Sequence, residues 1–96
     1  MEIEHVRRVL QAHRQEIALL GVRSLAVFGS VARGEAQERS DVDMLVEFSL
    51  PVGIFQFVRV KAYLESILGC PVDLVVEDAI RPQMRDRILR EAVHAA

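Results

Sequence analysis

The 96 residues include 51% hydrophobic and 27% charged residues, and the net charge at pH 7 is −2. Such proportions exclude a disordered or fibrous chain and indicate an ordinary globular domain, which we expect to span residues 1–96 as one unit. A protein with a small negative net charge lacks the basic surface of a general nucleic-acid-binding protein, so we expect no direct nucleic-acid binding.

The cellular location is predicted from cysteine usage and apolar runs. The single cysteine, Cys70, cannot form an internal disulfide, and the first residues lack the basic and apolar regions of a secretion signal. No apolar stretch approaches the roughly 20 residues needed to cross a bilayer. We therefore expect a cytoplasmic protein without a membrane partner.

The first predicted element is an amphipathic helix over residues 3–20, which Gly21 ends. Its apolar stripe recurs at intervals of three, four or seven residues and consists of Ile3, Val6, Leu10, Ile17 and Leu20. Residues 24–28 then predict a short buried strand that ends at Gly29. A short helix over residues 30–33 and an exposed polar loop over residues 34–40 follow.

Residues 41–48 alternate between polar and apolar side chains, as a half-buried strand does. Because side chains two apart on a strand point the same way, the pattern places Asp41 and Asp43 on one face. The opposite face carries the apolar residues Val42, Met44, Val46 and Phe48. The two carboxylates are therefore expected to point away from the core.

Residues 51–68 predict a long helix with Gly69 as its terminator, and its apolar residues occupy more than one side. The excess apolar surface lies around Phe55, Val60, Tyr63 and Ile67. Two interpretations stay open: a surface for a partner, or a helix that crosses the sheet with both flanks covered by neighbouring elements.

A third strand is predicted over residues 71–77 with Asp73 on its polar face, and a last helix over residues 82–93. Pro82 suits the first turn of that helix, and Asp78 is a candidate cap. The predicted fold class is thus α+β, a small mixed sheet of about three strands flanked by about four helices.

The chemistry is predicted by the spacing of a Gly-Ser pair and an Asp-x-Asp pair. Gly29 allows backbone amides to approach a triphosphate, and Ser30 adds a hydroxyl and an amide. Arg33 either reaches a phosphate or is a surface charge. Ser40 either orients the loop before Asp41 or caps it. These four residues are the predicted nucleotide-binding group.

Carboxylates supply the predicted metal site. Mg²⁺ takes hard oxygen ligands, and two ions about 4 Å apart hold the attacking and leaving oxygens of a nucleotidyl transfer. Asp41 and Asp43 anchor such ions from one strand face, and Asp73 on the next strand is the candidate third ligand and proton acceptor. Crowded carboxylates repel one another, which favours a cation among them. Asp41, Asp43 and Asp73 are therefore the predicted catalytic and metal-binding residues.

The run from Gly29 to Gly34, followed by Ser40-Asp41-Val42-Asp43, resembles the minimal nucleotidyltransferase family of the DNA polymerase β superfamily. The resemblance covers nearly the whole chain, and Met44 stands where leucine is more usual. It implies the polymerase-β-like fold, NTP and Mg²⁺ binding, and transfer of a nucleoside monophosphate.

Members of that family are often antitoxins that add AMP to a tyrosine of a HEPN-type ribonuclease toxin. The resemblance therefore implies ATP as the substrate and a HEPN-type partner in a hetero-oligomer. Two alternatives stay open. The chain neutralises its partner by binding alone, or it adenylylates a small molecule or an RNA.

Overall fold

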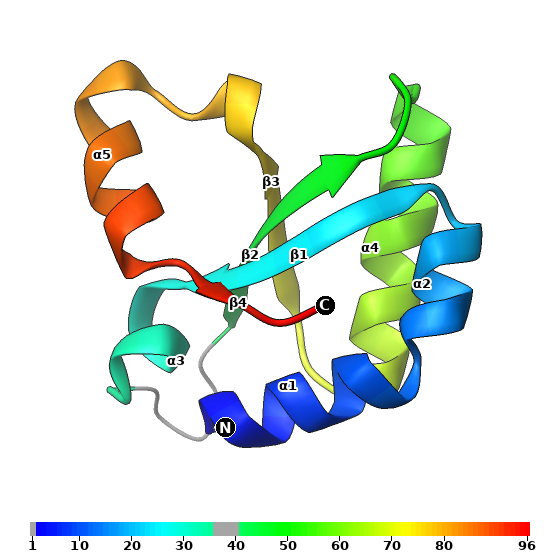
Figure 1. Cartoon of the computed structure of the whole chain (residues 1–96), viewed down its shortest axis with the longest axis horizontal. Helices are drawn as coiled ribbons and strands as arrows, with labels where there is room; N and C mark the ends of the chain where they lie inside the picture. The colour runs from blue at the N-terminus through cyan, green and yellow to red at the C-terminus, as the bar shows by residue number, and fades with distance from the viewer. Residues whose placement is uncertain (1, 36–40) are drawn as a thin grey trace.

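The computed structural model describes residues 2–35 and 41–96, so the predicted loop residue Ser40 lies outside the described residues. A twisted sheet stands at the centre of the molecule, with helices on both sides of it (Figure 1). The described strands are β1 (Val22–Phe28), β2 (Val42–Phe48), β3 (Val72–Val76) and β4 (Val93–His94). The described helices are α1 (Ile3–Ala12), α2 (Arg14–Leu19), α3 (Gly29–Arg33), α4 (Ile54–Leu68) and α5 (Pro82–Glu91).

The sheet is mixed and has the strand order β3-β2-β1-β4. β1 is antiparallel to β2 and to β4, whereas β2 and β3 run parallel. A parallel pair needs a long crossover, and α4 supplies it between β2 and β3. The mixed α+β architecture confirms the predicted fold class. The described strands number four, and the described α-helices five, one more of each than predicted.

The hydrophobic core lies on one face of the sheet, beneath α1, α2 and α4. Alternate residues of β2 are at most 1% exposed and point into it, while Asp43 between them is only half-buried. The helices contribute one apolar stripe each, and their innermost residues are Val6, Leu10, Ile17, Val60, Leu64 and Leu68. The alternation therefore directs the apolar side chains of β2 into the core and Asp43 to the other face, as predicted.

The first helix is not continuous. It breaks at His13, whose φ of −113° and ψ of 17° are not helical, and α2 begins at the next residue. The His13 Nδ1 atom lies 2.9 Å from the Val9 carbonyl oxygen, and a carbonyl oxygen only accepts, so Nδ1 donates this bond. No large apolar side chain between Leu10 and Ile17 is buried in the core. The helix axis can therefore change direction there without loss of core packing.

Other predicted boundaries and one predicted cap are also wrong: β1, for example, begins at Val22 rather than at residue 24. α4 begins at Ile54 rather than residue 51, with Gly53 as its N-cap. Asp41 precedes β2, because the parallel ladder starts where the Val42 amide donates to the Pro71 carbonyl oxygen at 3.1 Å. Asp78 does not cap the last helix: it lies in a 3-10 turn over Glu77–Ala79, and Arg81 is the N-cap.

The last helix ends at Glu91, so the prediction that it continues through Val93 is wrong. The chain instead forms β4, which pairs with Ala26 and Val27 of β1. The Ala95 amide donates to the Leu25 carbonyl oxygen at 2.9 Å, and the Leu25 amide donates to Ala96 at 2.8 Å. These bonds satisfy the backbone groups of β1 on the side away from β2. Among the described residues, no helix is long and apolar enough to span a membrane.

Candidate active site

The candidate site forms where β1 ends and where β2 and β3 begin. Because β2 lies between the other two strands, Asp43 faces Phe28 of β1 on one side and Asp73 of β3 on the other. The Gly29 turn follows Phe28 directly. Strand register thus brings together Gly29, Asp43 and Asp73, which lie up to 44 residues apart in the sequence.

Position 29 must be a glycine because its backbone approaches the Asp43 side chain closely. Its φ is +73°, in the left-handed region that favours glycine. A Cβ atom added there would overlap Asp43 Oδ2 and would stand 3.2 Å from Asp43 Cβ. The sequence predicts Gly29 as a residue that admits phosphate. The structure adds a second role, since only a residue without a side chain leaves room for the Asp43 carboxylate.

The Asp43 carboxylate lies in an electrostatically unfavourable place. Partial burial raises its pKa, and the charge of Asp73, hydrogen bonding with Asp73 and the charge of Asp41 raise the pKa further. The positive charge of Arg33 acts the other way and lowers the pKa of Asp43. The three predicted carboxylates therefore act on one another, as expected of groups that converge on one face.

The donor chemistry of the site fits Mg²⁺. Carboxylate oxygens are its preferred protein ligands, one or two of them commonly suffice, and a cation would relieve the repulsion that raises the pKa of Asp43. Among residues 2–35 and 41–96, however, no three His, Cys, Asp or Glu side chains are already gathered so that they could hold a metal ion. The half-buried Asp43 and the exposed Asp73, adjacent across the strands, form the core of the candidate metal site, and exposed Asp41 stands beside them.

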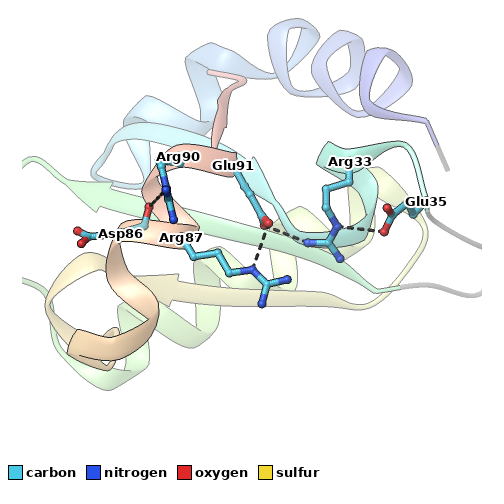
Figure 2. A network of polar contacts seen from close by, with 6 residues as sticks. All are labelled: Arg33, Glu35, Asp86, Arg87, Arg90 and Glu91. Carbon is cyan, nitrogen blue, oxygen red and sulfur yellow. Dashed lines mark hydrogen bonds and ion pairs between the residues drawn. The ribbon is translucent and has the colours of Figure 1, made fainter.

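Ser30 and Arg33 lie on α3, which begins at Gly29 and packs against β1 and β2. Ser30 is half-buried in the first turn, next to the glycine that touches Asp43. The Arg33 side chain is 35% exposed and is not a solitary surface charge. Its Nε atom donates to Glu35 Oε2 and its Nη1 atom to Glu91 Oε2, each at 3.0 Å (Figure 2).

Glu91 is a neighbour of the site that no sequence pattern indicates. It lies 58 residues beyond Arg33, at the end of α5, and sequence spacing offers no signal for such a contact. Its side chain is 22% exposed and also accepts a bond from Arg87 Nε at 3.3 Å. These two arginines lower the pKa of Glu91, against the opposing effect of burial.

A family model of the nucleotidyltransferase domain matches residues 6–94 of this chain. The chain therefore belongs to the nucleotidyltransferase domain family. It is similar to protein adenylyltransferase MntA of Thermococcus cleftensis, with 40% identity over 95 residues that cover 98% of this chain and 96% of the relative.

Solved structures share the fold of this chain. One, assigned as a minimal nucleotidyltransferase, has a TM-score of 0.82 and 42% identity over 97% of this chain and 95% of its own. A crystal structure of a toxin–antitoxin with AMP-PNP has a TM-score of 0.73 and 19% identity over 95% of this chain and 72% of its own. At that identity the second likeness shows the fold alone.

Proposed function

We propose that this chain is a Mg²⁺-dependent adenylyltransferase that transfers AMP from ATP to a tyrosine hydroxyl of a HEPN-type toxin, and so acts as its antitoxin. The observation that carries the proposal is the register that places Asp43 between Asp73 and the Gly29 turn. The similarity to an adenylyltransferase named MntA supports a protein acceptor, and the fold shared with a toxin–antitoxin structure supports the partner class. A cytoplasmic location stays a prediction.

The residues have distinct proposed roles in the transfer. Gly29 and Ser30 would hold the triphosphate beside Asp43, with Arg33 on the same short helix. Asp41, Asp43 and Asp73 would hold up to two Mg²⁺ ions, which supply charge neutralisation of the triphosphate and a lower pKa for the attacking hydroxyl. Asp73 would accept the proton of that hydroxyl as its oxygen attacks the α-phosphorus of ATP and pyrophosphate leaves.

The test is transfer of label. The chain, a HEPN-type partner, Mg²⁺ and α-labelled ATP are incubated together, and the partner is analysed by mass spectrometry for added AMP on tyrosine. We expect the wild type to label the partner and the Asp41→Ala, Asp43→Ala double variant not to. Asp78→Ala is the matched control, because Asp78 is an exposed aspartate beyond the other end of β3. An unlabelled partner in the presence of the wild type would refute the proposal.

Neutralisation by binding alone is the second candidate, and an exposed apolar surface favours it. The apolar patch consists of Leu50, Ile54, Phe55 and Val58, which are between 53% and 89% exposed. The predicted partner surface was partly wrong, because Val60 is buried and Tyr63 and Ile67 pack partly against the core. Size-exclusion chromatography of the chain with its partner in the absence of nucleotide tests this candidate, and separate elution at micromolar concentrations would exclude it.

A further inference from the structure

Two arginines from different elements converge on one carboxylate beside the candidate site. Glu91, the last residue of α5, accepts Arg33 Nη1 through Oε2 and Arg87 Nε through Oε1. Figure 2 shows the Glu91 side chain between the two guanidinium groups. Both carboxylate oxygens are therefore engaged, and the bond to Arg33 joins α5 to the helix that carries the Gly29-Ser30 turn.

The backbone around Glu91 is fixed close to the same turn. β4 begins two residues after Glu91, at Val93, which pairs with Val27 of β1. Val27 is two residues before Gly29 in the sequence. Glu91 is thus attached to the strand that leads into the turn, and its carboxylate is 22% exposed. Such a carboxylate has fewer alternative positions than one on a free surface helix.

Glu35 and Glu91 bind Arg33 through only part of its N–H donors. A guanidinium has five N–H donors in a planar fork. Nε donates to Glu35 and Nη1 donates to Glu91, so two edges of the fork are fixed and further N–H groups remain for an anion. The charge of Arg33 already acts on Asp43, whose pKa it lowers, so the guanidinium lies within electrostatic range of the candidate metal site.

From this geometry we infer that Glu91 is a positioning residue for nucleotide binding: it holds Arg33 where the remaining N–H groups of the guanidinium meet the triphosphate of ATP. The inference rests on the proposed function and deepens it, since it assigns a role to a residue outside the Gly-Ser and Asp-x-Asp motifs. Arg87 stabilises the Glu91 carboxylate through its other oxygen, Oε1.

The direction of the effect separates positioning from two simpler roles. A carboxylate that merely adds negative charge near the site repels the triphosphate, so its removal would tighten ATP binding. A carboxylate that merely joins α5 to α3 through Arg33 stabilises the fold, so its removal would lower the Tm and leave the Kd for ATP unchanged. A positioning carboxylate acts through Arg33, so its removal weakens ATP binding only when Arg33 is there.

The experiment is a double-mutant cycle with Glu91→Gln and Arg33→Ala. The Kd for Mg²⁺–ATP is measured by isothermal titration calorimetry, and Tm is measured in parallel. Glutamine keeps the volume of Glu91 and removes its charge. We expect Glu91→Gln to raise the Kd about three- to tenfold, which lies within the range of coupled neighbouring residues, and to have no further effect in the Arg33→Ala chain.

Glu77→Gln is the matched control, because Glu77 also accepts a bond from an arginine of α5, Arg85, at 2.5 Å and takes no part in the Arg33 contacts. We expect its Kd to equal that of the wild type. A Kd for Glu91→Gln that is unchanged or lower would overturn the inference, as would an equal rise in the Arg33→Ala chain. Failure of the wild type to bind ATP would instead refute the proposed function, and the inference with it.

Discussion

Gly29 and Gly34 have nearly the same backbone, with φ values of +73° and +74°, but different surroundings. A Cβ added at Gly34 would meet nothing within 4 Å, whereas one at Gly29 would overlap the Asp43 carboxylate. The two glycines flank the same short helix. Comparison of the two positions therefore separates backbone strain from the displacement of Asp43.

We expect Gly34→Ala to lower the free energy of unfolding by about 1–2 kcal/mol, the cost of a left-handed alanine, and to leave AMP transfer intact. Gly29→Ala carries the same strain and must also move Asp43, so we expect a larger loss of stability and an almost complete loss of transfer. Urea unfolding and the labelling assay measure both effects. Equal activity of the two variants would show that Asp43 does not need its present position.

The charge of Asp43 opposes folding when no cation is bound. The pKa of Asp43 in the folded chain is raised above the ordinary value of 3.8, which holds in the unfolded chain. At a pH between the unfolded-state pKa and the folded-state pKa, the folded chain therefore binds the proton more tightly than the unfolded chain does. Stability therefore falls as the pH rises through that window, and the penalty is fully present above it. At neutral pH the charged Asp43 side chain thus lowers the stability of the metal-free fold, while it provides a carboxylate for the candidate metal site.

We expect Asp43→Asn to raise the Tm at pH 7 in EDTA, and this gain to shrink as the pH is lowered towards 3.8 and below. The same variant should lose AMP transfer by about a hundredfold or more, since even indirect changes at metal sites cost 10–100-fold. Calorimetric scans at several pH values measure the gain. Asp78→Asn, at an exposed position, should leave the Tm unchanged, and a Tm of Asp43→Asn below that of the wild type would contradict the prediction.

At the scale of elements, β4 is the part of the fold that the sequence does not reveal. Alanine favours helices, and residues 92–96 include Ala92, Ala95 and Ala96, so the local signal is that of a continuing helix. The neighbouring strand β1, about 70 residues earlier, decides otherwise because its backbone groups need partners. β4 also brings Glu91 to Arg33.

Ala95→Pro tests the importance of this edge. Proline removes the amide that donates to Leu25 at 2.9 Å, and Ala95 is only 1% exposed. We expect a loss of about 2–3 kcal/mol in the free energy of unfolding, typical of a lost ladder bond together with a steric clash. His94→Ala, at the exposed neighbouring position, should change it by less than about 0.5 kcal/mol. Chemical denaturation compares the two variants, and equal stability would show that β4 contributes little.

At the scale of the whole molecule, the candidate site and the apolar patch lie at opposite ends of the sheet. β2 carries Asp43 near its start and leads through Phe48 to Leu50 of the patch. Seven strand residues span roughly 20 Å. Substitutions at the patch and at the site therefore act on separate parts of the molecule.

We expect the Leu50→Asp, Phe55→Asp double variant to weaken the binding of the HEPN-type partner about tenfold or more, because exposed apolar anchors dominate such interfaces. The Tm and the Kd for ATP should stay unchanged, since these side chains are 75% and 89% exposed and distant from the site. Met84→Asp, at an exposed apolar position on α5, is the matched control. Biolayer interferometry measures the partner Kd, and wild-type affinity in the double variant would place the interface elsewhere.

Much of the fold was predictable from the sequence because its strands and helices show strong local patterns of apolar and polar residues. The alternation in residues 41–48 predicted the correct face for Asp43, and Gly69 follows the last residue of α4 as expected. The errors lie where distant contacts decide: the break at His13, the start of the ladder at Val42, the end of α5 and the burial of Val60. Each depends on which surface another element covers, and no local pattern contains that information.

By itself, the sequence determined the chemical type of the site, because the Gly-Ser pair, the Asp-x-Asp pair and the alternation around Asp43 are local features. Only the tertiary structure decided that Asp73 stands opposite Asp43, that Gly29 makes room for the Asp43 carboxylate, and that Glu91 holds Arg33. The physical reason is that strand register and helix packing are fixed by contacts between segments far apart in the chain.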